Sequence, residues 1–396
     1  MDILRIVPND TPGKRTSALV ILMILVTVGS IFAGFSTHSE VLRALLFGIS
    51  IFAAAFILSW GAELAELEIP KSMAVAILAL ITVLPEYAVD GYFAWTAGKD
   101  PSYIAYATAN MTGGNRLIIG VGWALVVFLF WLKTRKGKLE FERGSRVEVG
   151  YLLVASLYSF IIPLKGTISI FDTVIFVALF VGYMLRISKT HKEEPHLVGP
   201  PKLISMFSKN KRRILTVFFF VFAAAAIFSV VEPFAEALLN TGRLNGLDEF
   251  FLVQWLAPLA SEAPEFIVAC IFVLKLLPKT GFGALLSSKI NQWTLLIGTL
   301  PVIYAISLGA LHPMVLDHRQ VQELLLTAAQ SLFAVSILLN LRITFKGAIT
   351  LFALFIFQFL HPELHYPLSF VYLLMAAFFF ARDRSHIMPA IKSLWK

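Results

Sequence analysis

The chain has 396 residues, of which 58% are hydrophobic, and 35 of them are phenylalanine. Soluble domains contain only about 45–50% apolar residues, so this composition excludes an ordinary soluble domain and indicates an all-α integral membrane protein. The formal net charge of +8 would suit a nucleic-acid-binding protein, but the distribution of the charges argues against that class. The single cysteine, Cys270, excludes an internal disulfide, and no Cys/His spacing predicts a zinc site.

Apolar segments follow one another along the whole chain. Most are about 17–30 residues long, which suits a membrane-spanning helix and exceeds the length of a β-barrel strand. The first of them predicts a retained span instead of a cleaved signal peptide. We therefore expect about twelve transmembrane helices, at roughly 17–35, 41–67, 71–97, 101–133, 149–165, 168–187, 213–240, 247–277, 281–310, 321–340, 344–360 and 366–382.

Basic residues concentrate in alternate connections between these segments. They fill the N-terminus, the loops 133–148 and 186–213 and the C-terminal tail, which twelve spans place on one side of the membrane. The positive-inside rule makes this side cytoplasmic, with both termini inside. Because this asymmetry accounts for the net charge, we expect the lipid bilayer and inorganic cations as partners, and no nucleic acid. A bacterial-type inner membrane fits best, and the sequence leaves the oligomeric state open.

A loop with three prolines and mixed charge, residues 188–212, is the predicted cytoplasmic linker between two halves. Five spans on each side of it form two units, 41–187 and 213–360. These units run through the membrane in opposite directions, as inverted transporter repeats do. One extra helix remains at each end, within residues 1–40 and 361–396. No connection is long enough to fold a soluble regulatory domain.

The most unusual polar residues lie in the middle of two predicted spans. The relevant side chains are Thr82, Pro85, Glu86 and Asp90 in the first half, and Ser261, Glu262, Pro264 and Glu265 in the second. An acidic side chain at the centre of a membrane helix costs roughly 2.5–3.5 kcal/mol on insertion, so a span that keeps two needs a reason. Two Pro-Glu steps at corresponding places in two halves indicate a transporter with an internal repeat.

The spacing of the acids predicts that they form a cluster. Glu86 and Asp90 are four residues apart, and Glu262 and Glu265 are three apart, so each pair shares a helix face. A proline in mid-helix also leaves the carbonyl one turn earlier without its partner. Carboxylate and free carbonyl oxygens are hard ligands that suit Na⁺ or Ca²⁺. If the two faces meet at the repeat interface, they make a cation site near the bilayer midplane.

The spans that follow the two Pro-Glu segments add amides, hydroxyls and two cations. They contain Asn110, Gly113, Gly114, Asn115 and Arg116 in the first half, and Ser287, Lys289 and Asn291 in the second. One interpretation is that these polar groups complete the cation site. The structural alternative is that the prolines only kink their helices, that the amides pack helices together, and that the acids pair with Arg116 and Lys289.

This pattern resembles the cation/Ca²⁺ antiporter superfamily, which includes the sodium/calcium exchangers. In that family two inverted α-repeats each contain a Gly-Thr-Ser-x-Pro-Glu core, followed after a short loop by Gly-Asn-x-x-Gly-Ser-Asn. The matching residues are Thr82, Pro85, Glu86, Asn110, Gly113 and Asn115 in the first repeat, and Pro264, Glu265 and Asn291 in the second, where Ser261 stands for Thr. The main departures are Glu262 in place of Ser, Leu286 in place of a ligand Asn or Asp, and Lys289 in place of Gly. The resemblance covers most of residues 41–360.

The resemblance implies that Glu86 and Glu265 are the central Ca²⁺/Na⁺ ligands. It places Thr82, Asn110 and Ser261 beside them.

The departures from the family pattern change the charge of the expected site. Asp90 and Glu262 add negative charge, whereas Lys289 and Arg116 add positive charge. Because a lysine ammonium can stand in for Na⁺ or exchange a proton, these changes could shift the coupling towards protons. Secondary polar positions of the site are Asn115, Asn291 and Ser287.

Several functions remain open at this point. The leading hypothesis is a secondary active Na⁺/Ca²⁺ antiporter that works by alternating access, with no resident cofactor and no catalytic residue. Ca²⁺/H⁺ or Na⁺/H⁺ exchange on the same fold is the near alternative, and a degenerate homologue that does not transport is a third. An intramembrane enzyme has little support, since the chain has no Gly-x-Ser-x-Gly elbow and no catalytic Cys. Its eight histidines are predicted mostly in loops and near span ends.

Overall fold

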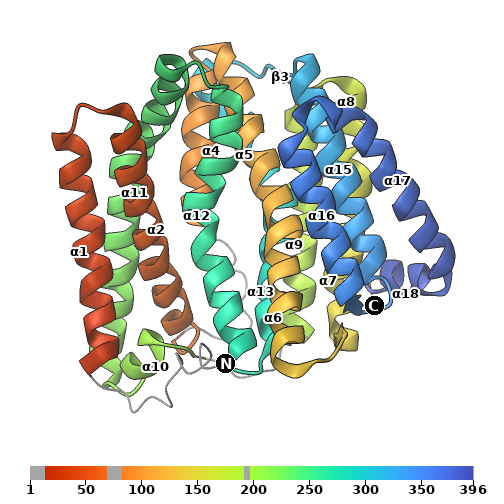
Figure 1. The fold of residues 1–396 in the computed structure, drawn as a ribbon, viewed down its shortest axis with the longest axis horizontal. Coiled ribbons are helices and arrows are strands. Elements are labelled where there is room, and N and C mark those ends of the chain that lie inside the picture. Colours follow the sequence, from red (N-terminus) through yellow and green to blue (C-terminus); the bar gives the residue numbers. More distant parts are fainter. Residues whose placement is uncertain (1–13, 69–82, 191–196, 396) are drawn as a thin grey trace.

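The computed structural model describes residues 14–68, 83–190 and 197–395, and nearly all of this part is helical (Figure 1). The helices are α1 (Lys14–Ser36), α2 (Glu40–Ala65), α4 (Leu84–Ala97), α5 (Ile104–Leu117), α6 (Ala124–Thr134), α7 (Arg146–Ser159), α8 (Ile161–Lys165), α9 (Ile170–Thr190), α10 (Pro200–Ile204), α11 (Lys209–Asn245), α12 (Glu249–Leu274), α13 (Pro278–Asn291), α14 (Ile297–Leu308), α15 (His318–Leu338), α16 (Phe345–Leu360), α17 (His365–Arg382) and α18 (Ile387–Lys392).

The long apolar helices confirm the predicted all-α membrane fold. Within the described residues, ten helical segments are long and apolar enough to cross a membrane, and α16 is a shorter apolar helix. Some predicted spans consist of more than one helix, as α5 and α6 do in the segment Pro101–Thr134. The predicted third span, 71–97, is described only from residue 83 onward. The count of twelve spans therefore stays a prediction.

The outer helices of the bundle expose apolar side chains. Leu25 and Phe32 of α1 are 63% and 70% exposed, and Leu374 of α17 is 72% exposed. A water-soluble protein rarely leaves contiguous apolar surface of this kind uncovered. These helix faces suit contact with lipid acyl chains, in agreement with the membrane fold.

The two Pro-Glu steps lie in different local structures. Pro85 is in the first turn of α4, whose N-cap is Val83, so its missing N–H breaks no hydrogen bond within α4. The expectation that Pro85 lies in the middle of a helix is therefore wrong for the described part of the chain. Hydropathy alone could not show this, because an apolar run looks the same whether a proline kinks one helix or begins another. Pro264, as expected, lies inside a helix, since α12 continues past it to Leu274.

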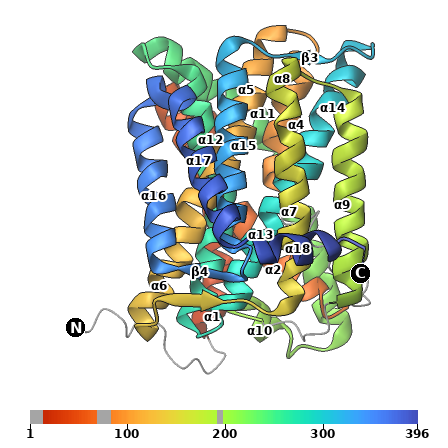
Figure 2. The same cartoon turned by 90° about the vertical axis from the view of Figure 1, so that its right-hand side faces the viewer.

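Two short antiparallel ladders connect the halves of the chain. β1 (Lys138–Glu140) pairs with β4 (Arg342–Thr344), and β2 (Thr167–Ile168) pairs with β3 (Met314–Val315). In the first half the order is α6, β1, α7, α8, β2 and α9, and in the second half it is α14, β3, α15, β4 and α16. β1 therefore corresponds to β3 and β2 to β4, so the two ladders are equivalent pairings. β3 and β4 lie at opposite ends of the bundle (Figure 2). An inverted repeat requires this arrangement.

Two π-helical segments occupy corresponding places in the same halves. η3 (Ile118–Trp123) begins three residues after Asn115, and η5 (Gln292–Leu296) begins directly after Asn291. Both asparagines match the end of the second repeat motif. π-helical turns inside α-helices are rare and occur mostly at functional sites. Their recurrence supports two related halves and draws attention to the helices around these asparagines.

α12 lies at the centre of the helices that carry the predicted site (Figure 1). It packs against α5 and α13 and also contacts α2 and α4. α12 belongs to the second half of the chain, and its neighbours α4 and α5 belong to the first. The site residues of the two halves therefore meet around this helix.

Candidate cation site

Four acidic side chains come together where α4 meets α12. Glu86 lies in the first turn of α4, and Asp90 follows one turn later. Glu262 and Glu265 lie on either side of Pro264 in α12. Glu86 interacts electrostatically with Glu265, Glu262 and Asp90, so the two pairs face each other as the sequence predicted. The partly positive N-terminal end of α4 also favours negative charge at Glu86.

These acids are withdrawn from solvent. Asp90 is fully buried, Glu262 is 1% exposed and Glu86 is 2% exposed, while Glu265 is half-buried. Among the described residues, no hydrogen-bond partner reaches either oxygen of Glu86, Oδ2 of Asp90, Oε2 of Glu262 or Oε1 of Glu265. Buried carboxylate oxygens without donors are costly unless a cation or a proton neutralises them. This set of oxygens has the chemistry of a site that is filled by a cation.

The four acids do not already form a closed metal cage. In the described part of the chain, no three side chains of His, Cys, Asp or Glu have the geometry to hold one metal ion. Binding of a divalent cation at this place therefore needs a small approach of the carboxylates, or oxygen ligands from other groups.

Neutral oxygen ligands lie next to the acids. Asn110 donates a hydrogen bond from its amide nitrogen to Asp90 Oδ1 at 2.8 Å, and its own buried Oδ1 has no partner among the described residues. The Ser261 hydroxyl donates to main-chain oxygens of its own helix, of which Ala257 O is 3.2 Å away. Thr82 lies outside the described residues. Of the two neutral ligands that the structure describes, Asn110 has an oxygen without a hydrogen-bond partner, and Ser261 donates its proton, which leaves the lone pairs of its oxygen for a cation.

Lys289 is buried beside the acids and bonds to the other half of the chain. Its ammonium donates to Asn115 Oδ1 at 2.6 Å and to Asn115 O at 3.3 Å. It lies 4.2 Å from the centre of the Trp293 ring and interacts electrostatically with Glu262. The sequence predicted that Lys289 modifies the charge of the site, and its position fits that prediction.

The remaining polar positions have bonding partners elsewhere in the helix packing. Asn291 Oδ1 accepts a hydrogen bond at 2.8 Å from the hydroxyl of Tyr87, the residue that follows Glu86. Ser287 Oγ is 2.6 Å from the hydroxyl of Tyr183 on α9. The Ser288 hydroxyl, which the sequence analysis does not single out, lies near Glu265 and has no hydrogen-bond partner among the described residues.

Comparison with known proteins shows what kind of protein contains this arrangement. A family model described as sodium/calcium exchanger protein matches residues 38–189 and 215–361. The chain belongs to this family. The predicted membership of the cation/Ca²⁺ antiporter superfamily is therefore confirmed. The protein is a cation/Ca²⁺ antiporter of the membrane. No curated protein sequence matches the chain.

Solved structures of other exchangers share the fold. An H⁺/Ca²⁺ exchanger, CAX, is 44% identical, with a TM-score of 0.92 over 96% of this chain and 98% of that chain. YfkE is 17% identical, with a TM-score of 0.62 over 92% and 99% of the two chains. The sodium-calcium exchanger NCX_Mj is 15% identical, with a TM-score of 0.54 over 85% and 98%. The last two similarities concern the fold alone.

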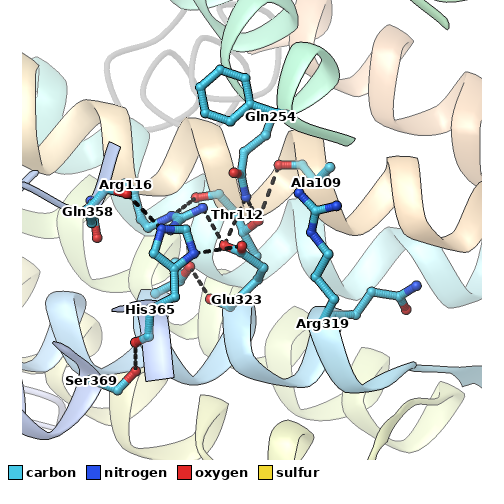
Figure 3. A network of polar contacts seen from close by, with 12 residues as sticks. Ala109, Thr112, Arg116, Gln254, Arg319, Glu323, Gln358, His365 and Ser369 are labelled. Carbon is cyan, nitrogen blue, oxygen red and sulfur yellow. Dashed lines mark hydrogen bonds and ion pairs between the residues drawn. The ribbon is translucent and has the colours of Figure 1, made fainter. Parts of the chain in front are cut away.

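Arg116 of the exchanger belongs to a second buried cluster. Its guanidinium forms an ion pair with Glu323 of α15, with 2.6 Å between Nη2 and Oε2 (Figure 3). Glu323 also accepts a hydrogen bond from Gln254 Nε2 at 3.0 Å and lies 2.8 Å from Nδ1 of His365. The side chain of Arg116 thus pairs with an acid of its own, and the four acids of the cation site do not take it as their counter-ion.

Sequence reasoning missed most of this second cluster. The sequence predicts His365 among the histidines in loops and near span ends. His365 does begin α17, but it is only 4% exposed. Its Nε2 lies 2.8 Å from the main-chain oxygen of Gln358. The available signal was Glu323, an acid inside the apolar segment 321–340, together with Arg116, a cation inside another span. A charge inside a span indicates that it has a partner, but not which residue that partner is.

Two glycines of α5 allow the helix to touch α12. A Cβ atom on Gly113 would lie 1.7 Å from the main-chain oxygen of Gln254, and one on Gly114 would lie 2.2 Å from Glu262 Oε1. Real side chains do not come this close, so glycine is required at Gly113, where the obstacle is backbone, whereas at Gly114 a side chain would displace the Glu262 carboxylate. This close approach brings the backbone of α5 next to Glu262 of α12.

Replacement of Gly113 by Ala is expected to destabilise the exchanger by about 1–3 kcal/mol or more, because the backbone of Gln254 has to move. Thermal unfolding of the purified protein in detergent measures the loss. Gly283→Ala is the matched control, since a Cβ there meets nothing within 4 Å in the middle of α13. Equal melting temperatures for the two variants would contradict the described contact between α5 and α12.

Proposed function

We propose that this exchanger moves Ca²⁺ across the membrane in exchange for protons, at the site formed by Glu86, Asp90, Glu262 and Glu265. The observation that supports this most strongly is the set of buried carboxylate oxygens without partners among the described residues. Carboxylates bind a divalent cation with their oxygens or take up protons on the same atoms. The relative that is 44% identical is an H⁺/Ca²⁺ exchanger, which supports the same pair of ions.

The mechanism follows from competition for one set of oxygens. Ca²⁺ binds between Glu86 of the first half of the chain and Glu265 of the second, and Asn110 Oδ1 supplies a neutral ligand. Protons on two of the carboxyl groups carry the same total charge as one Ca²⁺, so either load lowers the negative charge of the four acids by the same amount. An empty, fully charged site is costly to move through a water-poor interior. Alternating access then carries one load in each direction and suppresses leak.

Na⁺ as the counter-ion, which the sequence suggested first, is the second candidate. The unpartnered amide oxygen of Asn110 favours it, because Na⁺ binds neutral hard oxygen ligands. Protons and Na⁺ differ in the ligands that they need at this site. Two protons need only the carboxyl oxygens that are present, whereas Na⁺ needs further neutral ligands, and Leu286 stands at the position where the family has an Asn or Asp ligand.

The membrane orientation and the repeat boundaries belong to the same proposal. β1, β4 and α10 lie at one end of the bundle (Figure 2), and the loops that contain β1 and α10 are rich in Lys and Arg. This end is the proposed cytoplasmic side of a bacterial-type inner membrane. The repeat units are 41–187 and 213–360, with extra helices before and after them. The partners are then lipid and inorganic cations, and the transported ions undergo no covalent chemistry.

Uptake of Ca²⁺ into proteoliposomes tests the proposal. An outward proton gradient is expected to drive uptake, and an outward Na⁺ gradient at equal pH on both sides is not. Uptake driven by Na⁺ alone would establish the second candidate. Absence of Ca²⁺ flux under both gradients, in folded protein, would contradict Ca²⁺ exchange itself.

A further inference from the structure

A lysine side chain crosses from the second half of the chain to the first at the edge of the acidic cluster. Lys289 lies on α13 and is fully buried, and its ammonium bonds to both oxygens of Asn115 on α5. The centre of the Trp293 ring lies 4.2 Å from the Lys289 ammonium nitrogen, and the Glu262 carboxylate attracts it electrostatically without forming an ion pair. All of these neighbours are acceptors or electron-rich faces. The ammonium is thus surrounded in the way that a bound cation is.

These surroundings would also suit a free monovalent cation. Amide, main-chain and carboxylate oxygens are hard ligands for alkali and alkaline-earth cations, and an aromatic face attracts any cation. We propose that the Lys289 ammonium is a tethered cation that fills a monovalent-cation position beside the Ca²⁺ site, and that it thereby prevents Na⁺ from competing with Ca²⁺. This inference rests on the proposed Ca²⁺ site and assigns its selectivity against Na⁺ to one side chain.

The comparison of the two halves shows why this position is special. By the repeat motif, Lys289 corresponds to Gly113 in the first half. Gly113 has no side chain, and the backbone of α12 fills the space next to it. At the corresponding place in the second half, a long side chain spans the distance from α13 to α5 and bonds to Asn115. The two halves therefore differ at this position by one built-in positive charge.

A simpler role for Lys289 makes a different prediction. If the ammonium only offsets the charge of Glu262, its removal strengthens Ca²⁺ binding in any salt solution. If it occupies a cation position, its removal also opens that position to Na⁺. The difference between Na⁺ and an organic cation that is too large to enter separates the two roles.

Calorimetry of Ca²⁺ binding to the purified full-length protein provides this test. Each variant is titrated in sodium chloride and in choline chloride of equal ionic strength and pH, so that screening is the same. The wild type and Lys289→Arg are expected to bind Ca²⁺ equally well in both salts. Lys289→Ser is expected to bind Ca²⁺ about tenfold more weakly in sodium than in choline. Lys289→Gln, which preserves the length of the side chain, is expected to show the same direction.

The surface variant Lys279→Ser is the control, because its side chain is 54% exposed and pairs with Glu142 on the surface. Equal affinities in the two salts for a folded Lys289→Ser or Lys289→Gln protein would overturn the proposal. Competition by Na⁺ in the wild type as strong as in these variants would also overturn the proposal. The measurement on the wild type does not depend on whether a variant folds. A wild type that binds no Ca²⁺ in either salt would instead contradict the proposed Ca²⁺ site.

Discussion

Glu86→Gln is expected to reduce proton-driven Ca²⁺ uptake at least about a hundredfold, because two unit charges near 4 Å attract by about 4 kcal/mol even at an effective dielectric constant of 20. Glutamine retains the shape of the side chain and removes the charge. Both oxygens of Glu86 lack partners among the described residues, so the substitution breaks no hydrogen bond there. Glu265→Gln is expected to have the same effect from the other half of the site. Proteoliposome flux measures both.

The control for these variants is Glu140→Gln, an exposed residue of β1 that is expected to leave uptake unchanged. Melting temperatures in detergent show whether each variant is folded. A folded Glu86→Gln protein that transports Ca²⁺ at the rate of the wild type would contradict the proposed site. It would also leave the buried oxygens of Glu86 without an explanation.

Arg116→Met is expected to destabilise the exchanger by about 3–5 kcal/mol, since it leaves the Glu323 carboxylate buried without its charged partner. Both side chains of this ion pair are at most 4% exposed. In the double variant Arg116→Met, Glu323→Leu much of the stability is expected to return, because no buried charge remains. His365 and Gln254, which also bond to Glu323, lose a partner in the double variant. Complete recovery is therefore not expected.

Arg319→Met offers a matched comparison on the surface. Arg319 pairs with Asp248, and their side chains are 41% and 48% exposed, so solvent replaces the lost contact. Its loss is expected to cost less than about 1 kcal/mol. Unfolding in detergent measures all of these variants. Similar costs for Arg116→Met and Arg319→Met would show that burial of the Arg116 pair does not matter as described.

Much of the fold could be predicted because the bilayer leaves few choices. A long apolar segment in a membrane has to satisfy its own backbone hydrogen bonds, so hydropathy predicts helices. The four acids could be predicted for a related reason: carboxylates inside apolar spans are costly, and they stand out in the sequence. The spacing of Glu262 and Glu265 on one helix face was also readable, since helical geometry is local.

The bonding partners of the buried cations were not predictable. By sequence alone Arg116 could pair with any acid in the spans, because nothing in the sequence measures its distance to Glu323, 207 positions later. Lys289 likewise bonds to Asn115, across 174 positions. Such pairings depend on how helices from the two halves pack, and packing depends on contacts such as that of Gly113 with Gln254. Local patterns in one sequence do not contain this information.

The two short ladders limit how this molecule can change shape. β1 shares hydrogen bonds with β4 at one end of the bundle, and β2 shares them with β3 at the other. A rocking motion of one complete half against the other would pull both pairs of strands apart. The ladders therefore keep the segments that they connect fixed relative to one another. Helices outside these segments have to move when the site opens to either side.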